Sequence, residues 1–279
     1  MRSCGKWVLG LLGLVVAGWL VLRPGGLLDR GRAGRLGDEL VVDLGGGVTM
    51  QFVLIQPGSF MMGSDRSEET FLRPVHQVTI TRPFYMGKYE VTQEQWEKIS
   101  GQNRSLFRDP RVALGGRRPV ENVRWYDCVR FAEALNGKAE GYEFRLPTEA
   151  EWEYASRAGS TGVYGFGDDV AALDEFAWHG GNARGETHPV GQKKPNAWGL
   201  FDMHGNVWEW CQDFYGPYPG TPVSDPTGAS AGTHVLRGGA WNSAPDHVTC
   251  AYRYDLDADD YYSYYGFRCV AVPTSGRAR

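Results

Sequence analysis

The chain has 279 residues, a formal net charge of −4 and 42% hydrophobic residues, including 10 tryptophans. This much apolar material excludes a disordered chain, and scattered basic residues give no reason to expect nucleic acid as a partner. The 38 glycines and 15 prolines predict one large, loop-rich domain with short appendages.

The N-terminal residues 1–24 are typical of a membrane anchor or signal segment. Residues 7–22 form an uninterrupted run of apolar residues and glycine, preceded by Arg2 and Lys6. The run is shorter than the roughly 20 residues of a usual spanning helix and longer than many cleaved signal cores. Because no clear small-residue cleavage site follows it, we expect an inner-membrane anchor with the domain exported. A secreted or periplasmic protein is the alternative.

The rest of the chain is expected to form a linker, residues 25–43, followed by one domain, residues 44–274. Short apolar or alternating runs bounded by turn residues predict strands. They lie at residues 50–55, 61–64, 75–80, 84–91, 206–211 and 234–237, with a turn at 57–60.

Three helices are predicted from their caps and periodicity. Thr92 and Gln95 have the spacing of a capping box, which opens a helix that ends near Gly101. Thr148 and Glu151 repeat this pattern at the start of a second helix. Residues 125–135 carry apolar side chains at helical spacing and predict an amphipathic helix with one buried face.

The C-terminal segment, residues 237–270, surrounds irregular sequence with a regular frame. The frame consists of residues 237–241 (RGGAW), 251–253 (AYR) and 266–268 (GFR), in which glycine, aromatic residues and arginine alternate. This composition predicts short strands that meet at a crowded corner.

Two stretches lie between these frame segments: a short stretch, residues 242–247, and a tyrosine-rich stretch, residues 254–265. The tyrosine-rich stretch holds five tyrosines and four aspartates and has no apolar period. Burying its aspartates without partners would be costly, so we expect it to be exposed. Tyrosine gives a large contact area at a low rotamer cost, which favours a recognition surface. The alternative is an ordinary solvated loop.

Several segments, in order along the chain, resemble the formylglycine-generating enzyme family, also called the sulfatase-modifying-factor domain. They are residues 84–96 (FYMGKYEVTQEQW), 119–125, 145–159 (RLPTEAEWEYASRAG), 199–210 (GLFDMHGNVWEW), 237–241 and 266–269. The resemblance implies an α+β domain of C-type-lectin-like fold, loop-rich, with small antiparallel sheets and a few helices.

The copper centre of the resembled enzymes is not expected here. Those enzymes oxidise a substrate cysteine to formylglycine with copper held by two cysteine thiolates, which are soft ligands that suit Cu(I). The first matching position is Ser243, and no cysteine occurs between Trp241 and Cys250. Ala240 stands where the enzymes carry a serine. We therefore expect no copper and assign no catalytic residue.

The resemblance also implies a calcium site. In the resembled enzymes, Ca²⁺ is held by two side chains and two backbone carbonyls of one segment. The matching positions are Asp202 and Glu209 for the side chains, and Gly205 and Val207 for the carbonyls. Oxygen ligands from a tight loop suit Ca²⁺, so calcium is the expected cofactor. The alternative is that both acids serve as ordinary hydrogen-bonding residues.

One branch of the family comprises the variable proteins of diversity-generating retroelements, whose C-terminal segment is rewritten at adenines to give an exposed binding site. This chain resembles them in its frame, and most of its candidate positions can be reached from the codon AAC by changing only adenines. The candidate ligand-binding residues are Asn242, Ser243, Ala244, His247, Tyr254, Asp255, Leu256, Asp257, Asp260, Tyr261, Tyr262, Ser263, Tyr264 and Tyr265.

Two functions follow from the resemblance. The favoured one is an exported or membrane-anchored protein that binds a protein or glycan ligand. The alternative is a formylglycine-generating-type oxidase or another oxidoreductase of the family, supported by the frame itself. Ser243 and Ala240, at the positions of the catalytic centre, favour binding. Disulfide pairing among Cys128, Cys211, Cys250 and Cys269 stays open.

Overall fold

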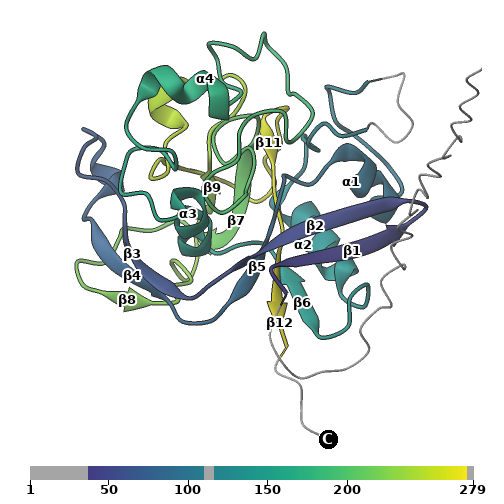
Figure 1. The fold of residues 1–279 in the computed structure, drawn as a ribbon, viewed down its shortest axis with the longest axis horizontal. Coiled ribbons are helices and arrows are strands. Elements are labelled where there is room, and N and C mark those ends of the chain that lie inside the picture. Colours follow the sequence, from purple (N-terminus) through teal and green to yellow (C-terminus); the bar gives the residue numbers. More distant parts are fainter. Residues whose placement is uncertain (1–36, 110–115, 275–279) are drawn as a thin grey trace, which may run out of the picture. The chain divides into compact units, whose positions relative to one another are not determined.

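The computed structural model describes residues 37–109 and 116–274 (Figure 1). The predicted apolar anchor, residues 7–22, lies outside the described residues, as does most of the predicted linker. Within the two described ranges, no helix is both long and apolar enough to cross a membrane.

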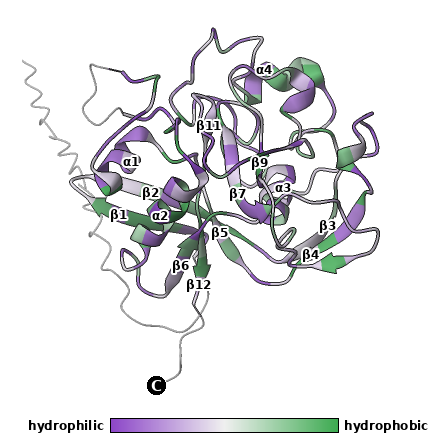
Figure 2. Ribbon diagram, turned by 180° about the vertical axis from the view of Figure 1, so that it is seen from behind, coloured by the Kyte–Doolittle hydropathy of each residue, from purple (hydrophilic) through white to green (hydrophobic). Residues whose placement is uncertain are grey.

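A five-stranded sheet has the order β1-β2-β5-β12-β6. Its strands are β1 (Glu39–Gly45), β2 (Val48–Ile55), β5 (Phe84–Gly87), β12 (Val270–Pro273) and β6 (Tyr142–Arg145). All neighbours in this sheet are antiparallel. Figure 2 shows β1, β5 and β12 as largely hydrophobic. The C-terminal segment thus leads directly into an interior strand of the sheet.

Two smaller sheets complete the strand arrangement. One has the order β10-β9-β7-β11, with β10 (Arg253–Leu256), β9 (His234–Arg237), β7 (Trp208–Phe214) and β11 (Tyr265–Gly266). The other has the order β3-β4-β8, with β3 (Gly58–Met62), β4 (His76–Ile80) and β8 (Val223–Ser224). The pairs β11–β7 and β4–β8 are parallel. Both ends of the tyrosine-rich stretch therefore belong to the four-stranded sheet.

The helices are α1 (Gln93–Ser100), α2 (Trp125–Leu135), α3 (Glu149–Arg157) and the short α4 (Leu173–Phe176). Helix α1 packs on β1 and β2, and α2 packs on β6. Helix α3 contacts β3, β7 and β9 and so lies between the two smaller sheets (Figure 1). The arrangement is α+β, as the sequence predicts.

The predicted helix starts are confirmed in detail. The Thr92 side chain accepts from the amide of Gln95, and the Gln95 side chain accepts from the amide of Thr92. Thr148 and Glu151 form the same reciprocal pair at α3. Helix α1 ends at Gly101 with a φ of 75°, where glycine carries no steric penalty.

The strands differ from the prediction at several places; β5, for example, ends at Gly87 instead of residue 91. Strand β1 begins at Glu39, inside the segment expected to be linker. The sequence does not indicate this strand clearly, because it lies at the edge of the sheet and only Val42 and Leu44 are buried. The expected turn at residues 57–60 belongs largely to β3. Gly58 suits that strand because a Cβ there would lie 2.2 Å from the Tyr154 hydroxyl. Strand β7 starts at Trp208, later than expected.

Candidate binding surface

The three arginines of the frame are buried and paired with carboxylates. Arg268 donates to both oxygens of Glu209, with each nitrogen–oxygen distance 2.7 Å. Arg253 pairs with Glu149 at 2.6 Å, while Arg237 pairs with the carboxylate of Glu153. Burial alone lowers the pKa of Arg268, but the carboxylates of Glu209, Glu90 and Asp202 together outweigh it, so the pKa lies above its usual value. The frame is therefore held by its side chains.

The backbone conformation explains why glycine occupies both positions of the pair in the frame. Gly238 and Gly239 have φ values of 95° and 74°, which other residues rarely adopt. A Cβ on Gly239 would lie 2.5 Å from the side chain of Val248, and one on Gly238 would lie 3.1 Å from Trp152. The chain can therefore turn here only because both side chains are absent.

The tyrosine-rich stretch is held mainly through its main chain. The carbonyls of Ala258 and Tyr262 accept from the amides of Trp125 and Asn122, at 3.2 and 3.1 Å. A further carbonyl, that of Tyr264, accepts at 2.8 Å from the amide of Trp208. In addition, the indole of Trp241 donates to the carbonyl of Ser263 at 3.0 Å. These bonds do not depend on which side chains the stretch carries.

The candidate residues divide by exposure. Tyr254, Tyr261 and Tyr262 expose 44%, 51% and 50% of their surface. Also exposed are Asn242, Ala244 and Asp257, while His247, Asp255, Leu256, Asp260, Ser263 and Tyr264 are half-buried. Residues 254–256 form part of strand β10 rather than a loop, because they pair with β9.

The expectation that the whole set is exposed is wrong for Ser243 and Tyr265. Tyr265 is only 3% exposed, because it pairs with Trp208 across β11 and β7 and packs on the ring of Trp210. Ser243 is 7% exposed, and its hydroxyl accepts from the Ala240 amide at 2.9 Å. Both residues support the frame.

Aromatic contacts join the short stretch to the tyrosine-rich stretch. The rings of His247 and Tyr252 lie 4.4 Å apart, and Trp208 lies 5.9 Å from both Tyr252 and Tyr254. Elsewhere, the ring centres of Trp241 and Tyr264 lie 6.5 Å apart. The Tyr264 ring in turn stacks on the Tyr262 ring, with the ring centres 5.4 Å apart. Ring contacts thus join His247 to Tyr254 through Tyr252 and Trp208, and a second group of contacts joins Trp241 to Tyr262.

The two predicted calcium-binding side chains have different partners. Asp202 accepts from the Gly191 amide with Oδ2, while its buried Oδ1 has no partner. Both Glu209 oxygens are bonded to Arg268, and Oε2 also accepts from the Trp152 indole at 2.7 Å. Across the described ranges, no group of three or more His, Cys, Asp or Glu side chains is arranged to hold a metal. Of the two acids, Asp202 is the one with a side-chain oxygen that has no partner, and the calcium site stays a prediction.

The two predicted backbone ligands lie in a tight turn beside these acids. Gly205 has a φ of 83°, and a Cβ there would lie 2.0 Å from the carbonyl oxygen of Trp178. The amide of Val207 donates to Glu90 at 3.0 Å. Burial, followed by the charges of Asp202 and Glu209, raises the pKa of Glu90 well above its usual value. Glu90, Asp202 and Glu209 are thus three buried acids beside one arginine, Arg268. This excess of carboxyl groups is the feature that favours a cation here.

Sequence reasoning missed the acids that hold the frame. Glu149 and Glu153 are 4% and 0% exposed, and they bind Arg253 and Arg237 from a distant part of the chain. The available signal was their spacing of four residues on α3, continued by Arg157, which places all three on one face.

A family model described as the sulfatase-modifying factor enzyme 1-like domain matches residues 46–272. The chain belongs to this family. The expectation drawn from the sequence motifs is thereby confirmed, and the short and tyrosine-rich stretches lie within the matched residues.

Three curated relatives illustrate the range of the family. LppX, a chaperone protein of Paenibacillus barcinonensis, is 30% identical over 80% of this chain and 90% of LppX. The serine/threonine-protein kinase pkn1 of Chlamydia pneumoniae is 34% identical over 80% of this chain but 38% of the kinase. A formylglycine-generating enzyme of Streptomyces coelicolor is 36% identical over 66% of this chain and 63% of the enzyme. The chain thus spans less than two thirds of the kinase and of the enzyme.

Two solved structures share the fold over nearly their full length. Treponema denticola variable protein 1 has a TM-score of 0.78 and 29% identity, covering 85% of this chain and 100% of its own. PvdO from Pseudomonas aeruginosa has a TM-score of 0.72 and 30% identity, covering 84% and 98%. The proteins similar to this chain therefore include both formylglycine-generating enzymes and a variable protein.

Proposed function

We propose that this protein binds a protein or glycan ligand through the exposed residues of its short and tyrosine-rich stretches. The observation that carries the proposal is the anchoring of the tyrosine-rich stretch through carbonyls of its main chain, which leaves Tyr254, Tyr261 and Tyr262 exposed. A surface held this way tolerates changes of side chain without loss of the fold. The likeness to a variable protein supports the same reading.

The chemistry of the surface suits recognition. Exposed tyrosines supply apolar area together with a hydroxyl group, and aromatic anchors concentrate binding energy. Asp257, in the same stretch, is also exposed. Its solvated charge contributes more to the specificity of ligand binding than to the affinity.

The cysteine chemistry argues against a copper-dependent oxidase. Burial raises the pKa of Cys250 to about 11 and raises the pKa values of Cys128 and Cys211 well above the usual range. These thiols are 0% exposed and pack as core residues, and the position that matches the first copper-binding cysteine of the resembled enzymes is Ser243. At the position matching the first copper ligand, the Ser243 hydroxyl is bonded to the Ala240 amide.

The setting of this binding protein is part of the proposal. We propose that residues 7–22 connect it to the membrane, or direct its secretion, and that the domain is exported. Calcium, bound near Asp202, is proposed as a structural ion, and nucleic acid is not a proposed partner.

The proposal is tested by screening the full chain against a glycan array and an array of extracellular proteins. A variant carrying Tyr254→Ser, Tyr261→Ser and Tyr262→Ser should lose the ligands that are found. A control carrying Val41→Ser and Val170→Ser, which removes comparably exposed apolar side chains elsewhere, should keep them. Ligands bound equally by both variants would refute the proposed surface.

A second assay addresses the oxidase alternative. The full chain, incubated with Cu(I), oxygen and a sulfatase-type peptide that contains cysteine, should form no formylglycine above background. Turnover in mass spectrometry would overturn the binding-protein proposal.

A further inference from the structure

Strand β3 has one free edge. It stands at the end of the order β3-β4-β8 and pairs antiparallel with β4 from Gly58 to Met62. Within the described residues, the main chain of 58–62 has no inter-strand partner other than β4. Because an antiparallel strand bonds to one neighbour through alternate residues, the remaining amides and carbonyls point outward. Figure 1 shows β3 on the α3 side of β4, opposite β8.

A cavity of about 550 Å³ lies along this edge. Its lining includes Phe60 as well as Ser59 and Met61. Consecutive strand residues point to opposite faces of a sheet, so a cavity that touches all three reaches both faces of β3, and on one of them it extends to Gln77 of β4. The lining also includes Val163 and Ala251. The cavity is within the volume range of ligand pockets, roughly 300–1,000 Å³.

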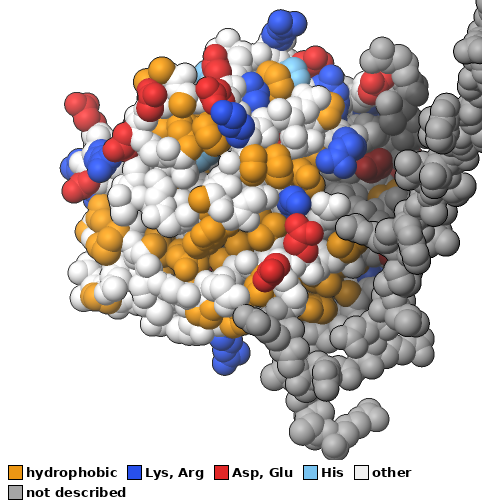
Figure 3. Space-filling view, in the orientation of Figure 1, with side chains coloured by type: hydrophobic (Ala, Val, Ile, Leu, Met, Phe, Trp, Pro, Cys, Tyr) orange, Lys and Arg blue, Asp and Glu red, His pale blue; other side chains and the backbone are white. Residues whose placement is uncertain are grey.

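Aromatic rings line one side of the cavity. Tyr154 lies 5.3 Å from the ring of Phe60 and 4.9 Å from that of Trp198. Hydrophobic side chains also gather in a band across the face of the molecule drawn in Figure 3, over the region of α3 and β3. Rings of this kind offer an apolar side chain a place beside the free edge.

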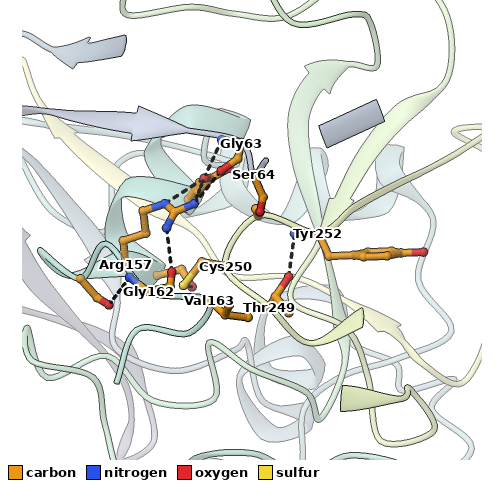
Figure 4. Close-up of polar contacts among 12 residues, drawn as sticks. Gly63, Ser64, Arg157, Gly162, Val163, Thr249, Cys250 and Tyr252 are labelled. Atoms are coloured by element: carbon orange, nitrogen blue, oxygen red, sulfur yellow. Dashed lines mark hydrogen bonds and ion pairs between the residues drawn. The ribbon is translucent and has the colours of Figure 1, made fainter. Parts of the chain in front are cut away.

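The two arginines that line the cavity are each paired with a carboxylate of the protein. Arg157 donates to Glu153 at 2.7 and 2.9 Å and to the carbonyls of Gly63 and Gly162 (Figure 4). Arg66 pairs with Asp168 at 2.8 Å. These guanidinium groups therefore do not attract an anionic ligand.

One negative charge at the rim is not neutralised in this way. Among the described residues that line the cavity, Asp65 is the charged side chain without an ion pair. Arg73 donates to the backbone carbonyl of Asp65, not to its carboxylate. The cavity therefore suits a ligand that is neutral apart from one cationic residue, which pairs with the Asp65 carboxylate.

We propose that the free edge of β3 binds an extended peptide segment as an added strand. Its main chain bonds to the outward amides and carbonyls of residues 58–62, as in other strand-addition complexes. An apolar side chain packs against Tyr154 and Trp198, and a Lys or Arg lies near Asp65. The site shares no residue with the exposed tyrosines of the proposed ligand surface and stands independently of that proposal.

The test begins with random linear dodecapeptides displayed on phage and selected on the full chain. Enriched peptides are synthesised, and their affinity is measured by fluorescence anisotropy. Trp198→Ala should weaken binding roughly tenfold, which is about 1.4 kcal/mol, and Asp65→Asn should weaken it less, in a salt-dependent manner. N-methylation of the peptide at alternate residues should abolish binding, whereas methylation at the residues between them should be tolerated.

Controls separate this site from the tyrosine-rich stretch and from misfolding. Tyr261→Ser should bind the peptides as the wild type does, which distinguishes a failure here from a failure of the proposed function. Hydrogen exchange on the unmodified chain should show peptide-dependent protection of amides in residues 58–62, a readout that needs no variant. The proposal is overturned if no enriched peptide depends on Trp198, if N-methylation at no position weakens binding, or if these amides stay unprotected.

Discussion

The frame and the tyrosine-rich stretch are neighbours in sequence but are held by opposite means. In the frame, Arg237, Arg253 and Arg268 are at most 3% exposed and bind carboxylates through their side chains. In residues 254–265, carbonyls of the main chain carry most of the anchoring bonds, and three tyrosines reach solvent. Where side chains hold the structure, the residue type is fixed. Where the main chain holds it and the side chain is exposed, the residue type is free to change, which is the property that a diversified binding surface needs.

The largest expected effect is in the frame. Arg268→Met leaves the Glu209 carboxylate buried without its cation, so the free energy of unfolding should fall by about 3–5 kcal/mol. The matched control is Arg130→Met, which removes an arginine whose side chain is 67% exposed in an ion pair with Asp127. The control should cost about 0–1 kcal/mol. Chemical denaturation of both variants measures the difference, and equal losses would show that the frame arginine is not structural.

The next effect separates two tyrosines of the same stretch. Tyr265→Ala removes a ring from the core and should cost about 3 kcal/mol or more. Tyr262→Ala removes a half-exposed ring and should cost about 0.5 kcal/mol. The comparison is made by urea unfolding. A Tyr262 variant as unstable as the Tyr265 variant would place the exposed tyrosines in the core.

Calcium removal should have an intermediate effect. An ion bound only by the folded state stabilises it by about 2.7 kcal/mol when its concentration is 100 times Kd. Chelation with EGTA should therefore lower the melting temperature, and Asp202→Ala should remove that response. Identical melting curves with and without chelator would leave Asp202 with a hydrogen-bonding role alone.

A smaller, pH-dependent effect is expected at Asp213 on β7. Burial, with a further contribution from Glu149, raises the pKa of Asp213 to about 7, above the unfolded value of about 3.9. Its contribution to stability is therefore complete below about pH 4 and is lost as the pH rises through 7. Asp213→Asn should be more stable relative to wild type at pH 8 than at pH 5, by about 2.6 kcal/mol, which is about 1.4 kcal/mol for each pH unit between 5 and 7. A pH-independent difference in melting temperature would contradict this reasoning.

Local patterns predicted much of the fold, whereas non-local pairing limited the prediction of the site. The capping boxes at Thr92 and Thr148 depend on residues three positions away, so the sequence displays them. Tyr265 and Tyr262 look alike in sequence, and only the pairing of β11 with β7 makes one of them core. Strand β1 likewise gains its identity from pairing with β2.

The partners of the frame arginines show the same limit. Glu149 and Arg253 are 104 positions apart in the chain, and Glu153 and Arg237 are 84 apart. Nothing local indicates that α3 lies under the frame. The glycine pair, by contrast, was recognisable as a crowded corner because the absence of a side chain is visible in the sequence itself.

The central claim is tested most directly by comparing two display libraries of the full chain. One randomises Tyr254, Asp257, Tyr261 and Tyr262, and the other randomises Arg237, Gly239, Arg253 and Arg268. We predict that most members of the first library fold, as judged by protease resistance, that few members of the second do, and that selection against hen lysozyme recovers binders from the first. If the first library loses its folded members as completely as the second, the tyrosine-rich stretch is a structural element and the account is wrong.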